Sequence, residues 1–187
     1  MLYQIISFLL DVAAGLLCGA CLLRAYMPVA RVSFQNPIGP FVMALSNWLV
    51  LPLRRVLPSV GAVDSASLVG ALLIQLAHFG LLWLALGLLG SGGGNLVNLL
   101  WFAIFEVLKI AVTGMIGLLI VYAVLSFVQV RSAISVAIEA FCALPLAPLR
   151  RIIPPVGGLD LSPLALIVLL QILLMVLQRT VSMLVSL

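Results

Sequence analysis

The residues of this sequence that could carry chemistry are four ionisable side chains inside long apolar stretches. Asp11, His78, Glu106 and Lys109 each lie among residues that are mostly hydrophobic. An ionisable group inside a membrane segment is a candidate for ion binding or proton transfer. Glu106 and Lys109 are three residues apart, share one helix face and can pair. Asp11 should lie at a similar depth, which predicts a cluster able to bind a cation or relay protons.

The same polar residues also have structural interpretations. An ion pair could hold the first and third membrane helices together, and His78 alone is typical of a residue hydrogen-bonded within a helix bundle. Gln75 and Gln171 lie 96 residues apart and could bond to each other between helices. Cys18 and Cys21 have C-x-x-C spacing but lie in an apolar helical run without a second pair. We therefore interpret both cysteines as packing residues.

A second set of candidate residues occurs twice, at the same spacing of 96 residues. Segments 51–76 and 147–172 are identical at 11 of 26 positions without a gap, and each contains P-L-R-R-x-x-P-x-x-G-x-x-D. The first copy supplies Pro52, Arg54, Arg55, Pro58, Gly61 and Asp64, and the second supplies Pro148, Arg150, Arg151, Pro154, Gly157 and Asp160, followed by Ser162. A tandem duplication of about half the chain therefore sets the predicted architecture.

Each part of this motif has a physical role. The prolines stop a helix and stiffen the chain, and the glycines allow a tight turn. The aspartate, or a serine just after it, can cap the helix that follows. The arginines can pair with the aspartate or bind lipid phosphates through their planar donors. The motif thus predicts a connector that caps a helix and anchors it at the membrane surface. It also fits a basic surface that recruits a partner, and the two roles are compatible.

Composition restricts the class of protein. The chain has 187 residues, of which 65% are hydrophobic and 7% charged, whereas soluble domains carry about 25% charged residues. Most of the surface must therefore face lipid. The net charge of +4 comes from few basic residues without interleaved aromatics, so we expect contacts with anionic lipid head groups and none with nucleic acid. No catalytic set, metal-ligand spacing or phosphate loop is present, so we predict no enzyme and no cofactor.

Six apolar stretches must position these residues, and four of them are long enough to cross a bilayer. The predicted crossings are 4–27, 66–89, 97–127 and 163–185. Segments 39–57 and 133–153 contain prolines and polar residues, so we predict amphipathic helices that lie in the membrane interface. The predicted fold is an all-α membrane protein with two repeats, 1–90 and 97–187, joined by a glycine-rich outer turn at 91–96. Each repeat has the order transmembrane helix, interfacial helix, transmembrane helix.

The basic residues predict the orientation. Seven of the nine lie at the end of the first predicted crossing, between the first and second crossings, or between the third and fourth: Arg24, Arg31, Arg54, Arg55, Arg131, Arg150 and Arg151. The positive-inside rule then places both basic loops in the cytoplasm and both termini outside. Six crossings would put the first two of these arginines opposite the next two and remove the bias.

The duplicated motif gives the chain a family resemblance. Two copies of P-L-R-R…P…G…D, each after an interfacial stretch and before a crossing, resemble the YggT family, which is related to the YlmG group. Asn36-Pro37 is similar to the N-P of that family, and Ser132-Ala133 stand in its place in the second copy. The resemblance implies small multi-pass proteins of bacterial inner membranes and plastid membranes. Relatives are linked to osmotic tolerance, to cell division or nucleoid organisation, and to assembly of membrane complexes, without an agreed catalytic chemistry.

Two functions follow from these features. The first is a non-enzymatic membrane scaffold, assembly factor or osmotic stress tolerance factor. It would bind other membrane proteins, or further copies of itself, through its basic inner-face loops. The alternative is an oligomeric ion channel or transport component that uses Asp11, Glu106 and Lys109.

Overall fold

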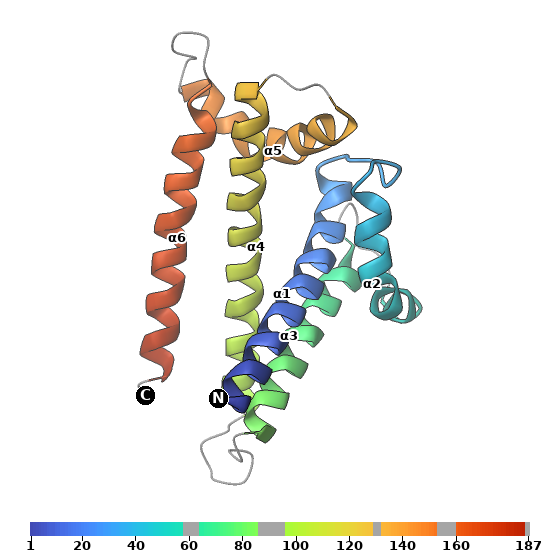
Figure 1. Cartoon of the computed structure of the whole chain (residues 1–187), viewed down its shortest axis with the longest axis vertical. Helices are drawn as coiled ribbons and strands as arrows, with labels where there is room; N and C mark the ends of the chain where they lie inside the picture. The colour runs from blue at the N-terminus through green and yellow to red at the C-terminus, as the bar shows by residue number, and fades with distance from the viewer. Residues whose placement is uncertain (58–63, 86–95, 129–131, 153–159, 186–187) are drawn as a thin grey trace. The chain divides into compact units, whose positions relative to one another are not determined.

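The structure, a computed structural model, describes residues 1–57, 64–85, 96–128, 132–152 and 160–185. These residues form helices and contain no strand. The helices are α1 (Leu2–Val29), α2 (Gly39–Arg54), α3 (Ser65–Ala85), α4 (Leu96–Val128), α5 (Ala133–Ile152) and α6 (Ser162–Val185) (Figure 1). Each apolar stretch expected from the sequence is therefore helical, with ends close to those predicted.

Five of these helices are long and apolar enough to cross a membrane: α1, α3, α4, α5 and α6. The helix α2 has 16 residues and is not among them. The sequence predicted four crossings, with α5 in the interface. Because length and composition alone would admit α5 as a fifth crossing, the four-crossing arrangement stays a prediction.

The prolines interrupt the helices less than the sequence predicted. Pro52 lies inside α2, and α5 contains Pro145 and Pro148. The helix α2 continues to Arg54 because its last turn tightens: the amide of Arg55 donates to the carbonyl of Pro52 at 3.2 Å. A proline so close to a helix end removes few hydrogen bonds, so the expectation that Pro52 itself ends the helix is wrong by two residues.

The proline deep inside α5 has a compensating partner. Pro145 has no amide hydrogen to donate to the carbonyl of Phe141, four residues earlier. The hydroxyl of Tyr26 donates to that carbonyl at 3.0 Å. The two aromatic rings also stack, with centroids 6.1 Å apart. A side chain therefore satisfies the backbone group that the proline leaves without its helical partner.

The starts of α2 and α5 are capped by different chemistry at equivalent sequence positions. The side-chain oxygen of Asn36 accepts the amides of Ile38 and Gly39 at 2.9 and 2.7 Å. At the position 96 residues later, Ser132 accepts the amide of Ser135 at 3.1 Å and donates its own amide to the Ser135 hydroxyl at 2.8 Å. Both arrangements satisfy amides that a helix leaves free at its N-terminus.

The chain divides into two compact units. The first contains Met1–Ala25 and Val42–Ala111, and the second contains Tyr26–Phe41 and Val112–Leu187. The helix α4 contributes to both units, whereas the predicted repeats divide before it. The units are defined by packing and do not test sequence repeats, so the repeat boundaries 1–90 and 97–187 stay predictions. Residues 91–95 of the predicted glycine-rich turn lie outside the described residues, and Leu96 begins α4.

In the first unit a core of small and branched residues joins α1, α2 and α3. Its buried members are Ala14, Cys18, Cys21, Val50, Ala66, Ala71 and Ile74, with Val107 and Ile110 of α4 packed against them. A side-chain carbon at Gly70 would lie 3.5 Å from Leu49, so α3 packs closely on α2 at this glycine. Small residues at helix contacts let backbones approach, which is the usual way that membrane helices pack.

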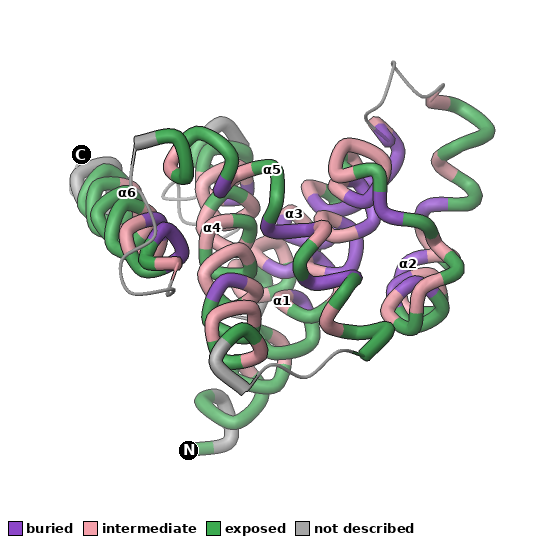
Figure 2. The backbone as a smooth tube through the Cα atoms, turned by 90° about the horizontal axis from the view of Figure 1, so that it is seen from above, coloured by how far each residue is buried: buried purple, intermediate pink, exposed green. Residues whose placement is uncertain are grey.

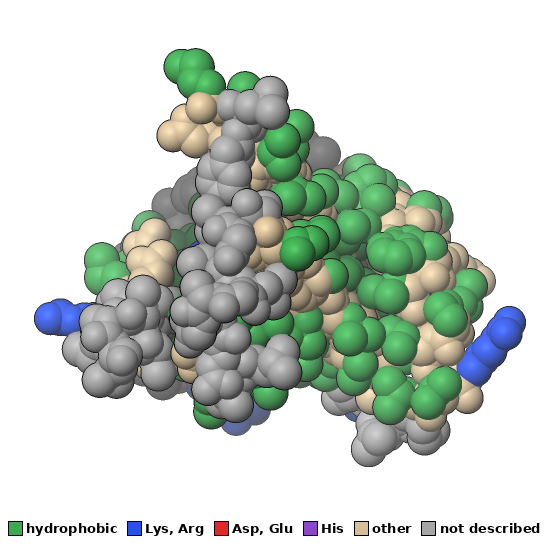
Figure 3. Space-filling model, turned by 90° about the horizontal axis from the view of Figure 1, so that it is seen from below, with side chains coloured by type: hydrophobic (Ala, Val, Ile, Leu, Met, Phe, Trp, Pro, Cys, Tyr) green, Lys and Arg blue, Asp and Glu red, His purple; other side chains and the backbone are tan. Residues whose placement is uncertain are grey.

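In the second unit α5 crosses the ends of α4 and α6 and does not run alongside them (Figures 1 and 2). Its buried core consists of Leu119, Ile138, Cys142, Leu146 and Leu166. The helix α6 exposes most of its described length (Figure 2). Hydrophobic side chains also dominate the described part of the face in Figure 3. Apolar surface on this scale fits lipid as the solvent.

Candidate functional site

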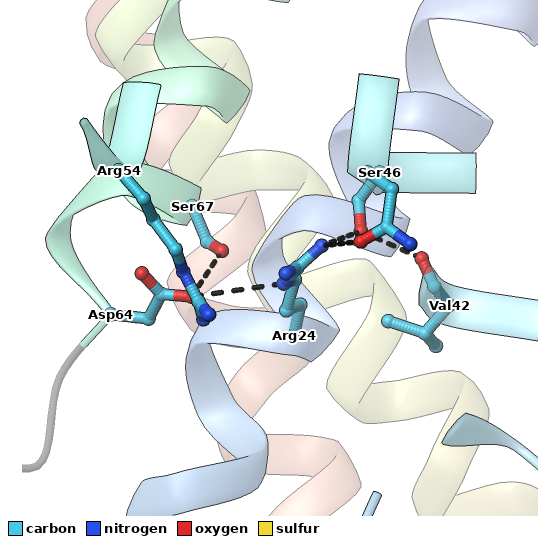
Figure 4. A network of polar contacts seen from close by, with 7 residues as sticks. Arg24, Val42, Ser46, Arg54, Asp64 and Ser67 are labelled. Carbon is cyan, nitrogen blue, oxygen red and sulfur yellow. Dashed lines mark hydrogen bonds and ion pairs between the residues drawn. The ribbon is translucent and has the colours of Figure 1, made fainter. Parts of the chain in front are cut away.

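The first copy of the arginine motif forms a buried ion-pair network in the first unit (Figure 4). Asp64 immediately precedes α3, and its carboxylate accepts a hydrogen bond from Arg54 at 2.5 Å and one from the Ser67 hydroxyl at 2.8 Å. The Nε atom of Arg24 lies 3.7 Å from the same carboxylate oxygen. Only 5% of the Asp64 side chain is exposed. The network therefore ties the ends of α1 and α2 to the start of α3.

Arg24 reaches a second polar contact on α2. Its Nη1 atom donates to the hydroxyl of Ser46 and to the amide oxygen of Asn47, both at 2.8 Å. Ser46 in turn donates to the carbonyl of Val42 at 2.7 Å. Arg24 is buried, and these neutral acceptors replace part of the water that its guanidinium loses. Its Nε atom has no hydrogen-bond partner among the described residues and interacts with Asp64 through charge alone.

The network controls the protonation of Asp64. Burial favours the neutral acid, but the hydrogen bonds from Arg54 and Ser67 and the charges of Arg54 and Arg24 outweigh it. The pKa of the Asp64 carboxyl therefore lies below its usual value. At neutral pH the carboxylate is ionised and pairs with the two arginines.

The second copy forms a smaller and more exposed pair in the second unit. The Nε atom of Arg150 donates to Asp160 at 2.9 Å, and its Nη2 atom donates to the Tyr122 hydroxyl at 2.6 Å. The other oxygen of Asp160 accepts the amide of Ser162, the first residue of α6, at 3.0 Å. Burial raises the pKa of Asp160, but the hydrogen bonds from Ser162 and Arg150 lower it by more than burial raises it. The pKa of Asp160 therefore lies below its usual value. The predicted capping role of Asp160 is confirmed.

The two arginines of each motif have different surroundings. Arg54 and Arg150 hold the aspartates, whereas Arg55 and Arg151 are exposed, and their side chains form no ion pair or hydrogen bond within the described residues. The motif residues Pro58, Gly61, Pro154 and Gly157 lie outside those residues. One arginine of each pair is therefore structural, and the other is available to a lipid or a partner.

The ionisable residues of the helices line a cavity in the first unit. Asp11 of α1, His78 of α3, and Glu106 and Lys109 of α4 surround a volume of about 370 Å³, together with Gly15, Gln75, Phe79 and Ile110. The Nε2 atom of His78 lies 2.9 Å from the Asp11 carboxylate. Lys109 donates to both oxygens of Glu106, at 2.8 and 2.9 Å. The structure thus brings together all four residues that the sequence singled out, as two adjacent pairs.

The glutamines at equivalent sequence positions have different environments. Gln75 is buried and lines the cavity, whereas Gln171 is exposed on α6 in the other unit. The hydrogen bond predicted between them stays a prediction. Cys18 and Cys21 are free thiols buried in the core of the first unit, as their interpretation as packing residues requires.

Sequence reasoning missed several partners in these sites. We had treated Arg24 only as a basic residue at a helix end, and Ser46 and Asn47 only as signs of an interfacial helix. Tyr26 and Tyr122, each of which donates or accepts a hydrogen bond, carried no signal in the sequence beyond their equivalent positions in the repeat. An arginine in one apolar helix and two polar residues in the next could have suggested a contact, but not which residues meet.

Together the long apolar helices, their exposed hydrophobic surface and the arginine motifs define a helical membrane protein. Comparison with known protein families identifies the family: the model of the CCB3/YggT family matches residues 3–85 and 101–181. The chain belongs to this family.

The relatives are similar over most of their length. The chain is 33% identical to the uncharacterized protein YggT of Escherichia coli K12 over 185 residues, which cover 96% of this chain and 94% of the relative. It is 34% identical over 168 residues to an uncharacterized protein in the proC 3' region of Vibrio alginolyticus, covering 88% of this chain and 89% of the relative. No solved structure matches the sequence. These names assign no activity, so the function must be argued from the chain itself.

Proposed function

We propose that this protein is a non-enzymatic scaffold or assembly factor of the bacterial inner membrane that binds partner proteins through Arg55 and Arg151. The observation that carries the proposal is that the two arginines of each motif have different partners. Arg54 and Arg150 are engaged by aspartates, whereas the adjacent arginines are exposed and without a partner among the described residues. An exposed guanidinium on a fixed helix end is suited to carboxylates or phosphates of a partner.

The proposal includes the four-crossing topology. In it α1, α3, α4 and α6 cross the membrane, while α2 and α5 lie in the cytoplasmic interface and both termini are periplasmic. The orientation of α5 across the ends of α4 and α6 supports this arrangement. The helices α2 and α5 also segregate polar from apolar residues more strongly than the other four helices. Amphipathic helices of this kind bind at the membrane surface, and anionic lipids attract their arginines.

The decisive experiment compares the wild-type chain with one double variant and one single control variant. A photo-crosslinking residue is placed at position 56, next to Arg55, and the proteins captured in cells are identified by mass spectrometry. We expect the wild-type chain to capture partners that Arg55→Gln/Arg151→Gln loses, while the variant protein keeps its thermal stability. Arg179→Gln removes one positive charge from α6 and serves as the control. If the double variant captures the same proteins as wild type, the basic face does not recruit partners.

An osmotic role can be tested in the same strains. Cells that lack the protein and carry each variant are grown at high osmolarity. A scaffold that acts in stress tolerance through its arginines predicts that Arg55→Gln/Arg151→Gln fails to restore growth although the protein accumulates normally. Full restoration by this variant would separate stress tolerance from the basic face.

A further inference from the structure

A membrane-embedded cavity in the first unit is not used by the proposed scaffold role. It is lined from α1, α3 and α4 by Asp11, Gln75, His78, Glu106 and Lys109. At a rise of 1.5 Å per residue, Asp11 lies about 10 Å inside the candidate span that begins at Gln4. On the same scale Glu106 lies about 12 Å and His78 about 9 Å from the corresponding ends of their spans. The polar groups therefore share one level, below the membrane surface.

The charges in this cavity do not balance. Lys109 is held by both oxygens of Glu106, so these two groups neutralise each other. The remaining carboxylate, Asp11, has His78 as its one ion-pair neighbour within the described part of the chain. Among Asp11, Glu106 and Lys109 the cavity therefore has two carboxylates and one ammonium group, an excess of one negative charge. An uncompensated charge at this depth is unfavourable, and one positive charge in the cavity would remove the imbalance.

One of the residues that line the cavity carries a buried acceptor without a partner among the described residues. Gln75 is only 1% exposed, and its side-chain oxygen Oε1 has no hydrogen-bond partner among the described residues. The Nδ1 atom of His78 is likewise buried without a partner in that part of the chain. Buried polar atoms in native proteins normally have a partner, so these atoms indicate that something polar occupies the cavity.

The two candidate ligands differ in exposure: the Asp11 side chain is 59% exposed, whereas Gln75 is almost fully buried. An accessible carboxylate attracts a cation, and a buried amide oxygen supplies a neutral ligand of the kind that hard cations prefer. The volume of about 370 Å³ leaves room for an ion and several of its waters.

We propose that this cavity is a binding site for one monovalent cation, held by the Asp11 carboxylate and the Gln75 amide oxygen. The charge of the ion follows from the net charge of the cavity. Lys109 weakens ion binding at this site, because its ammonium group neutralises the Glu106 carboxylate, which could otherwise also bind the ion. This proposal does not depend on the arginine face or on any partner protein.

The test measures binding to the full-length protein in nanodiscs at about pH 8, where an ordinary histidine is neutral. Sodium, potassium and ammonium chlorides are titrated against choline chloride at constant ionic strength, and both thermal stability and retention of radioactive sodium or rubidium are followed. At least one of the small cations should bind saturably, at one ion per chain, and choline should not.

Three variants separate a binding site from a structural ion pair. Asp11→Asn should weaken binding by about tenfold or more, because it removes the charge that attracts the ion. Gln75→Leu should also weaken binding while keeping the helix packed. Lys109→Met should tighten binding, since it frees the Glu106 carboxylate. Glu139→Gln removes an exposed carboxylate in the other unit and is the control.

The signs of these changes decide the proposal. Tightening by Lys109→Met together with weakening by Asp11→Asn supports a cation site, because loss of a structural ion pair would not change affinity in opposite directions. Absence of saturable binding would overturn the proposal. So would a Lys109→Met variant that loses binding as Asp11→Asn does, or a Glu139→Gln variant that weakens binding as strongly.

Discussion

The two arginine motifs share their sequence pattern, but their aspartate side chains differ in burial. In the first, 5% of the Asp64 side chain is exposed and the carboxylate faces two arginines. In the second, 28% of the Asp160 side chain is exposed, and among the described residues Arg150 alone pairs with it. The difference arises on other helices: Arg24 of α1 completes the first site, and the equivalent position 96 residues later is Ile120. Neighbouring residues therefore decide whether the same motif becomes a buried network or a surface pair.

The residues that accept hydrogen bonds from Arg24 also differ between the two halves of the chain. Ser46 and Asn47 receive its hydrogen bonds, and the equivalent residues of the second half are Cys142 and Ala143. The second half therefore lacks both the buried cation and the groups that stabilise it. A charge in a helix bundle requires a full set of partners, so the loss of one member makes the others unfavourable.

The largest expected effect tests this comparison directly. Asp64→Asn should lower the free energy of unfolding by about 3–5 kcal/mol, because it leaves Arg24 buried without a counter-charge. Asp160→Asn should lower it by about 1 kcal/mol or less, because its pair is solvent-exposed and asparagine still caps α6. Reversible unfolding of both variants in detergent micelles measures the two values.

A second substitution shows whether the buried arginine is the cause. In the Asp64→Asn protein, Arg24→Leu removes the uncompensated charge and should restore part of the lost stability. If the two aspartate variants are equally stable, the depth of the motif has no energetic consequence and the comparison fails.

The pH dependence of stability should come mainly from the first motif. The pKa of Asp64 is lowered in the folded protein, so its contribution is complete above the unfolded-state value of about 3.9 and is lost as the pH falls through the lower folded-state value. Thermal unfolding followed from about pH 7 to pH 3 should therefore show a loss of stability at the acid end. Asp64→Asn should flatten this profile more than Asp160→Asn, and the reverse order would contradict the network.

The smallest expected effect concerns the caps of α2 and α5. Asn36→Ala should destabilise the protein by about 1 kcal/mol, because two amides lose the oxygen that accepts them. Ser132→Ala should have an effect of about 0.5 kcal/mol, since the residue is exposed and water can replace its hydroxyl. Chemical unfolding measures both, and Asn36→Asp should retain the cap. An Asn36→Asp variant as unstable as Asn36→Ala would show that the cap is not the source of the effect.

Much of the local structure could be predicted because it depends on short stretches of sequence. Long apolar runs of this composition have few alternatives to helix, since lipid leaves backbone groups without other partners. Pairing of the motif arginines with the aspartate was one of two roles that the motif suggested, and in both copies the first arginine of the pair binds the aspartate. The burial of Arg24 could not be predicted, because its partners lie on other helices, 22, 23 and 40 residues away in sequence.

The sequence by itself determined the helical class, the membrane setting, the family and the ionisable residues worth testing, because hydropathy and local motifs act over a few turns of one helix. Only the tertiary structure decided which of those residues meet. It paired Asp11 with His78 beside Glu106 and Lys109, and it buried one arginine motif while leaving the other exposed. The physical reason is that an electrostatic interaction depends on distance and burial, and packing between helices fixes both.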